Sequence, residues 1–136
     1  MLHGNGVDII KIDHLKYFLD KIEDPFITKT YTSKELDLIL KRPNPVNSLA
    51  TRYAGKEAVF KCFGIHGNTI LLNEIEILEN EYGQPTVYLH GKAKNIANQL
   101  HINSIYLSLS YDTDYAIAYA VAEKEFSSKN IDAFQI

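Results

Sequence analysis

The sequence has one cysteine, no tryptophan and four prolines among its 136 residues. A single cysteine excludes an internal disulfide and a zinc site built from several cysteines. The longest apolar stretches, at Ile70–Leu72 and Tyr115–Ala122, fall far short of the roughly 20 residues that a transmembrane helix needs. Neither sign of charge dominates: 14 Lys and Arg against 17 Asp and Glu give a formal net charge of −3. This balance argues against broad electrostatic binding to nucleic acid.

What is present is the composition of an ordinary globular protein. Hydrophobic residues make up 46% and charged residues 23% of a chain whose length suits one domain. The first residues do not combine a charged region with a following apolar one, so we predict no secretory signal and expect a soluble, cytoplasmic protein. A core of this size is modest, which favours an oligomer that shares apolar surface.

Hydrophobic spacing and helix-capping residues divide the chain into strands and helices. Asp24-Pro25 is expected to end the first helix, and Thr32 with Glu35 forms a capping box that begins the second. No repeat or linker separates two domains. We therefore predict one α+β domain at residues 1–124, with a small antiparallel sheet against a long helix, and a loosely held tail at 125–136. Strands are predicted at residues 6–10, 73–78, 86–89, 105–111 and 115–122, and helices at 13–23, 32–40, 47–63 and 92–100.

Asp8 is the first residue that suggests chemistry, because it lies between Val7 and Ile9 in an apolar strand. An ionised carboxylate in such surroundings costs several kcal/mol unless it is paired or bound to metal. The simpler interpretation is an acid at a strand end that reaches solvent or caps a neighbouring helix.

The long helix carries two charged pairs at a spacing of four residues, Glu57 with Lys61 and Arg52 with Lys56. Residues four apart lie on the same helix face. A solvent-exposed helix surface would account for both pairs. Two aromatic side chains flank Glu57, however, and draw it toward the core, namely Tyr53 and Phe60.

Two carboxylates from separate elements, Asp8 and Glu57, with Lys61 and Arg52 nearby, suit a Mg²⁺ site for a phosphate-bearing substrate. Magnesium is held by one or two carboxylates together with water and substrate oxygens. Lysine and arginine supply positive charge to the phosphates.

Two further segments are compatible with ligand contact and equally with ordinary structure. Gly83-Gln84-Pro85 is a turn that allows close backbone approach to a ligand. Ser108 and Ser110 share the polar face of a strand, as either a phosphate-binding edge or a solvated surface. The five histidines lack the spacing of zinc ligands, and Cys62 on its apolar helix reads as a small buried hydrophobe.

Taken together, these segments resemble the holo-[acyl-carrier-protein] synthases, the short single-domain type of 4′-phosphopantetheinyl transferase. The resemblance runs from Gly4 to about Glu123. It is carried by Gly6-Val7-Asp8-Ile9, by Leu49-Ala50-Thr51-Arg52-Tyr53-Ala54-Gly55-Lys56-Glu57-Ala58 with Lys61, and by Gly83-Gln84-Pro85, Ser108-Leu109-Ser110 and Tyr115-Ala116. Each motif alone is weak, but the three occur in order at the family's spacing.

The resemblance implies transfer of 4′-phosphopantetheine from coenzyme A to a serine of apo acyl carrier protein, in support of fatty acid biosynthesis. It implies Asp8 and Glu57 as Mg²⁺ ligands, with Glu57 also deprotonating the acceptor serine directly or through a metal-bound water. Lys61 is implied to neutralise charge near the transferred phosphate and so to serve both catalysis and coenzyme A binding. The family fold and a homotrimer with coenzyme A between subunits are implied as well. The other implied coenzyme A contacts are Arg52, Gly83, Pro85, Ser110 and Tyr111.

The sequence departs from the family pattern at three places. Tyr111 stands where the family usually has a histidine that contacts coenzyme A phosphate, and tyrosine carries no positive charge near neutral pH. Tyr53 replaces the commoner tryptophan. His14 replaces an arginine of the surface that meets the carrier protein, so three lysines must supply the basic patch there: Lys11, Lys16 and Lys21.

Two alternatives follow from these residues. One is a relative that binds coenzyme A or carrier protein without turnover because of the change at Tyr111. The other is a Mg²⁺-dependent phosphoanhydride hydrolase, which would consume coenzyme A without an acceptor. Retention of Asp8, Glu57 and Lys61 favours the transferase over the binding-only relative.

Overall fold

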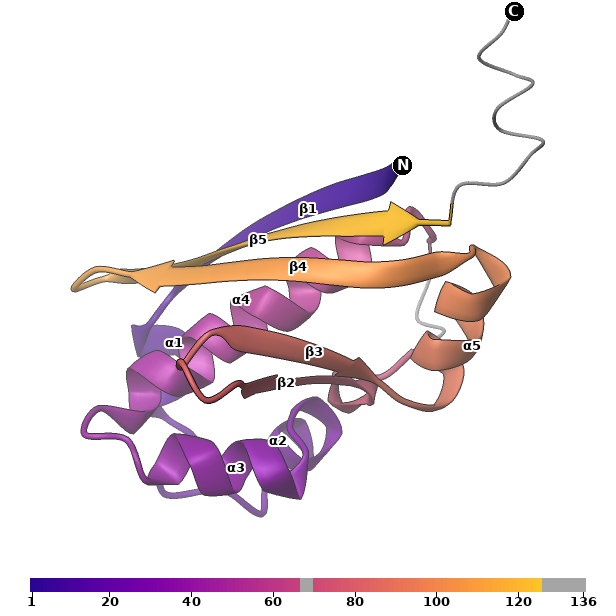
Figure 1. The fold of residues 1–136 in the computed structure, drawn as a ribbon. Helices are drawn as coiled ribbons and strands as arrows, with labels where there is room; N and C mark the ends of the chain where they lie inside the picture. The colour runs from indigo at the N-terminus through magenta and orange to yellow at the C-terminus, as the bar shows by residue number, and fades with distance from the viewer. Residues whose placement is uncertain (67–69, 126–136) are drawn as a thin grey trace, which may run out of the picture.

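The computed structural model describes residues 1–66 and 70–125, which form two antiparallel sheets and five α-helices (Figure 1). The expected tail, apart from Glu125, lies outside the described residues. The elements in chain order are β1 (Leu2–Lys11), α1 (Asp13–Lys16), α2 (Pro25–Thr30), α3 (Ser33–Leu40), α4 (Pro45–Cys62), a 3₁₀ turn (Leu72–Glu74), β2 (Ile75–Glu79), β3 (Pro85–Leu89), α5 (Gly91–Gln99), β4 (Ile102–Tyr111) and β5 (Tyr115–Lys124).

The long helix α4 is the centre of the molecule, as Figure 1 shows. The sheet of strand order β1-β5-β4 lies along one side of α4, and the β2-β3 sheet with α2 and α3 lies on the other. The predicted α+β class and the long central helix are confirmed, while the strands fall into two sheets rather than one. No helix among residues 1–66 and 70–125 is long and apolar enough to cross a membrane.

Small residues let α4 lie close against the three-stranded sheet. The inner face of β5 consists of four buried alanines, at 116, 118, 120 and 122. On the α4 side, Ala54 and Ala58 are fully buried as well. On β1, a Cβ added to Gly6 would lie 2.1 Å from the Ala58 carbonyl oxygen. Gly6 therefore sets the distance between β1 and α4, the two elements that carry Asp8 and Glu57.

Gly6→Ala is expected to lower the free energy of unfolding by about 1–3 kcal/mol, because the clash is with backbone that cannot rotate away. Urea denaturation at one protein concentration measures the change. Asn5→Ala, at an exposed position next to it, is the matched control. A Gly6→Ala protein as stable as the control would show that β1 and α4 can separate without cost.

In the described part of the chain, the outer face of the three-stranded sheet carries exposed apolar side chains. Val7, Ile9, Ile117 and Tyr119 project from β1 and β5 on this face, and between 41% and 62% of each is exposed. Strand register places these residues side by side, with Val7 opposite Tyr119 and Ile9 opposite Ile117.

The first predicted helix is wrong beyond its first turn. Helix α1 ends at Lys16, and a separate helix, α2, begins at Pro25. Asp24-Pro25 begins this helix instead of ending the previous one, because the Asp24 carboxylate accepts the Phe26 backbone N–H at 2.8 Å and proline suits the first helical position. A proline at the first helical position also begins α4, at Pro45, two residues before the predicted start of that helix at residue 47. The Thr32–Glu35 capping box is confirmed.

Candidate active site

A pair of carboxylates lies between β1 and α4. Asp8 extends from the inner face of β1, where Lys61 donates hydrogen bonds to its Oδ1 at 3.2 Å and to the Val7 carbonyl oxygen at 2.8 Å. Glu57 lies one helical turn before Lys61. Burial raises the pKa of Glu57, and the charge of Asp8 raises it further, while a hydrogen bond from Tyr53 and the charge of Lys61 oppose the shift. The predicted trio is therefore assembled, with Tyr53 as an added partner.

This pair has the chemistry of a magnesium site. Two carboxylates repel one another, and the ammonium group of Lys61 offsets them in part, so a further cation would relieve the repulsion. The described part of the chain contains no group of three or more His, Cys, Asp or Glu side chains placed to hold a metal ion. Two carboxylates nevertheless suffice for Mg²⁺, which keeps water or substrate oxygens in its other positions. Asp8 and Glu57 thus fit the ion that the sequence predicts.

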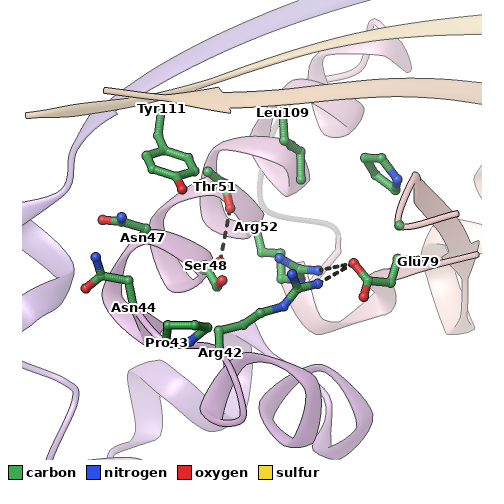
Figure 2. Close-up of a pocket in the computed structure, with 12 residues that line it drawn as sticks. Arg42, Pro43, Asn44, Asn47, Ser48, Thr51, Arg52, Glu79, Leu109 and Tyr111 are labelled. Atoms are coloured by element: carbon green, nitrogen blue, oxygen red, sulfur yellow. Dashed lines mark hydrogen bonds and ion pairs between the residues drawn. The ribbon is translucent and has the colours of Figure 1, made fainter. Parts of the chain in front are cut away.

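A cavity of about 440 Å³ lies on the other side of α4 (Figure 2). Arg52, Gly83, Pro85 and Tyr111 all line it, which brings together four of the six predicted coenzyme A contacts. Gly83 has a φ of 78°, a conformation that favours glycine, and forms the turn before Pro85. Tyr111 points into the cavity from the end of β4 (Figure 2).

Arg52 does not lie near the carboxylate pair, contrary to the sequence prediction. At about 100° per residue, the five steps from Arg52 to Glu57 place the two side chains about 140° apart around the helix. Arg52 therefore faces the cavity and Glu79, while Glu57 faces β1. The predicted site residues form two groups on two sides of α4.

The chain is similar to known proteins over most of its length. Residues 4–120 match the model of the 4′-phosphopantetheinyl transferase superfamily. A holo-[acyl-carrier-protein] synthase of Caldanaerobacter subterraneus subsp. tengcongensis is 39% identical over 86% of this chain and 91% of its own. The chain belongs to this family.

Solved structures of holo-[acyl-carrier-protein] synthases share the fold. The Plasmodium yoelii enzyme superposes with a TM-score of 0.79 at 31% identity, over 93% of this chain and 98% of its own. An ACPS–CoA complex from Chronobacterium ammoniagenes gives a TM-score of 0.75 at 25% identity, over 90% of this chain and 98% of that one. The chain is thus an enzyme of the phosphopantetheinyl transferase class.

Ser110 lies apart from both groups of this transferase. It is exposed on β4 and pairs with Ile117, which places it on the outer face of the sheet rather than in the cavity. Its predicted contact with coenzyme A therefore requires a ligand that reaches the outer face, and it stays a prediction.

A buried ion pair between α3 and α4 was missed by the sequence analysis. Lys56 and Glu35 have fully buried side chains and meet at 2.7 Å between Nζ and Oε1. Lys56 also donates to the carbonyl oxygens of Leu72 and Ile75. The interpretation of Lys56 and Arg52 as a solvent-exposed pair is wrong, because both are buried.

Cys62 is buried, as its apolar position predicts. Burial raises the pKa of its thiol to about 11, so the protonated thiol prevails at neutral pH. A nucleophilic cysteine needs a lowered pKa, and Cys62 therefore serves packing rather than chemistry.

Proposed function

We propose that this enzyme transfers 4′-phosphopantetheine from coenzyme A to a serine of apo acyl carrier protein, with Mg²⁺, in support of fatty acid biosynthesis. The carboxylate pair Asp8–Glu57 beside Lys61 is the observation that carries the proposal. Such a site suits attack on a pyrophosphate, where positioning and charge neutralisation matter more than covalent help from the protein. Cytoplasmic localisation stays a prediction.

Each residue of the pair has a defined part in the transfer. The serine oxygen forms a bond to the phosphorus next to the pantetheine, the bridging oxygen leaves with adenosine 3′,5′-bisphosphate, and the serine proton passes to Glu57. Asp8 and Glu57 would hold Mg²⁺, which when bound neutralises pyrophosphate charge. Lys61 supplies a further positive charge, and its half-exposed ammonium group can turn from Asp8 toward a phosphate.

The division of the site across α4 supports a composite site between subunits. One face of α4 carries the carboxylate pair and another faces the cavity of Arg52 and Tyr111. The outer face of β1 and β5 is a suitable surface for joining chains, because burying its exposed isoleucines and tyrosines removes apolar area from water. We propose that a homotrimer formed through this face brings the cavity of one chain toward the carboxylates of the next.

The acyl carrier protein needs a basic surface near the carboxylate pair. Lys11, His14, Lys16 and Lys21 are all exposed at the end of β1 and on the segment that follows it. These positive side chains, which share the segment with exposed Asp13, Asp20 and Glu23 and with partly buried Asp24, suit an acidic carrier and speed its association. We propose this basic surface as the docking site.

The deciding experiment is intact mass spectrometry of an apo acyl carrier protein incubated with the enzyme, coenzyme A and Mg²⁺, with EDTA as the control. A gain of one phosphopantetheine that EDTA abolishes supports both the transfer and the metal site. No gain across several carriers, while coenzyme A still binds, would favour the binding-only relative. Consumption of coenzyme A without any acceptor would favour the hydrolase.

Tyr111→His is expected to tighten coenzyme A binding by about two- to fivefold, because a histidine at the cavity wall can carry charge toward a phosphate. The gain should be larger at pH 6 than at pH 8, since histidine is protonated below about pH 6.5. Titration calorimetry at the two pH values measures it. Equal affinity of both proteins at pH 6 would mean that Tyr111 does not face a phosphate.

A further inference from the structure

A glutamate lies between the two arginines of the cavity. Glu79, at the end of β2, forms an ion pair with Arg42 and lies 3.9 Å from Nη2 of Arg52 (Figure 2). Arg42 comes from the segment after α3 and Arg52 from α4, so the carboxylate joins three parts of the chain. Neither Glu79 nor Arg42 belongs to the motifs described in the sequence.

The arginine pair is short of negative charge. Arg52 is 5% exposed, and within the described residues its Nε has no hydrogen-bond partner. Burial and the charge of Arg42 lower the pKa of Arg52, and Glu79 offsets this only in part. Two guanidinium groups thus share one carboxylate, and a buried donor of Arg52 has no partner among the described residues.

Coenzyme A carries its phosphates at two places, the pyrophosphate and the 3′-phosphate of the ribose, and either could meet this cluster. The pyrophosphate is the reacting group and belongs with Asp8, Glu57 and Lys61 under the proposed function. The 3′-phosphate of the ribose is then left for the cavity. A phosphate monoester there must share the arginines with Glu79, or displace it from Arg42.

We propose that Glu79 is a specificity-determining residue, a built-in carboxylate that competes with the 3′-phosphate for Arg42 and Arg52 and so weakens discrimination between coenzyme A and 3′-dephospho-coenzyme A. This inference rests on the proposed function. Its physical basis is the repulsion between two anions held by the same cations, in a cavity where Arg52 is almost fully removed from water. Uncharged Tyr111 on the opposite wall adds no cation to restore the balance.

The test compares the binding of coenzyme A and 3′-dephospho-coenzyme A to the wild type and to Glu79→Gln by titration calorimetry. Glu79→Gln keeps the shape of the side chain and removes its charge. It is expected to tighten coenzyme A binding about tenfold, while the affinity for the dephospho analogue changes less than about twofold. The gain should shrink at high salt, because the Glu79 side chain is partly exposed and salt screens its charge.

Two further variants keep the test decisive. Glu81→Gln removes an exposed carboxylate from the neighbouring turn, outside the cavity lining, and should leave both affinities unchanged. Glu79→Asp keeps the charge but withdraws it by one methylene, so its preference for coenzyme A should lie between those of the wild type and Glu79→Gln.

Each other result has a definite meaning. Equal changes for the two ligands, no change, or weaker coenzyme A binding in both Glu79 variants would overturn the inference and leave Glu79 a structural partner of Arg42. If the wild type modifies carrier protein but the Glu79 variants show the same preference between coenzyme A and its dephospho analogue, only this inference is overturned. A wild type that binds neither ligand and transfers nothing sinks the proposed function, and the inference with it.

Discussion

Glu57→Gln is expected to reduce phosphopantetheine transfer by at least about 10²–10³-fold without unfolding the protein. The loss combines a metal ligand with the group that accepts the serine proton, and each such contribution is of that order. The fold should persist because burial and Asp8 raise the pKa of Glu57, which means that its charged form is disfavoured in the folded chain. A neutral glutamine removes that penalty.

The measurement is the initial rate of carrier modification, followed by mass, together with the urea unfolding midpoint of the same samples. Asp37→Asn, which removes an exposed carboxylate on α3, is the control and should retain full activity. Near-normal transfer by Glu57→Gln would disprove the assignment of Glu57 as metal ligand and base. Lost transfer in an unfolded sample would be uninformative, so Glu57→Ala is measured in parallel.

Lys56→Met is expected to have the largest effect on stability, lowering the free energy of unfolding by about 3–5 kcal/mol. The substitution leaves the Glu35 carboxylate buried without its cation and removes the donor to the carbonyls of Leu72 and Ile75. Glu35 cannot turn to solvent, because its two oxygens also accept the backbone N–H groups of Thr32 and Ile77.

A double variant separates the charge from the packing. Lys56→Met combined with Glu35→Gln removes both charges and keeps an oxygen for one of the backbone donors, so it should be more stable than Lys56→Met alone. Urea denaturation at one protein concentration gives both values, and Lys92→Met at an exposed position is the control. A loss below about 1 kcal/mol in Lys56→Met would show that water reaches Glu35 in its place.

The sequence predicted the strands of the three-stranded sheet well because that sheet has one buried face, so burial alternates along its strands. Asp8 stood out because it lies between apolar neighbours, and Glu57 because two aromatic side chains, Tyr53 and Phe60, flank it on its helix face. Prediction failed on Lys56 and Arg52 because α4 is enclosed by elements on both sides, and its buried residues run around the helix. Most positions of such a helix are buried, so a charged residue at one of them needs a partner inside the protein.

Other features lay beyond any local pattern. Glu79 follows a half-buried strand and looks like a solvated strand end until the fold brings Arg42 and Arg52 to it. Likewise, α2 was hidden because Asp24-Pro25 can end one helix or begin another. The resemblance supplied the roles of the cavity residues, but their meeting in one cavity is a property of the folded chain.

The alanine face of β5 makes tolerance to substitution alternate along a single strand. At 116, 118, 120 and 122 the side chains lie under α4 with essentially no exposure, and any larger residue would lift the helix from the sheet. Because Glu57 and Lys61 belong to α4, such a change would move them away from Asp8, even though β5 contributes no residue to the carboxylate pair. One position along, at Tyr115, Ile117 and Tyr119, the side chains point away from α4 and their size is free of this constraint. Alternate positions of β5 therefore cannot accept larger side chains, although they lie away from the carboxylate pair.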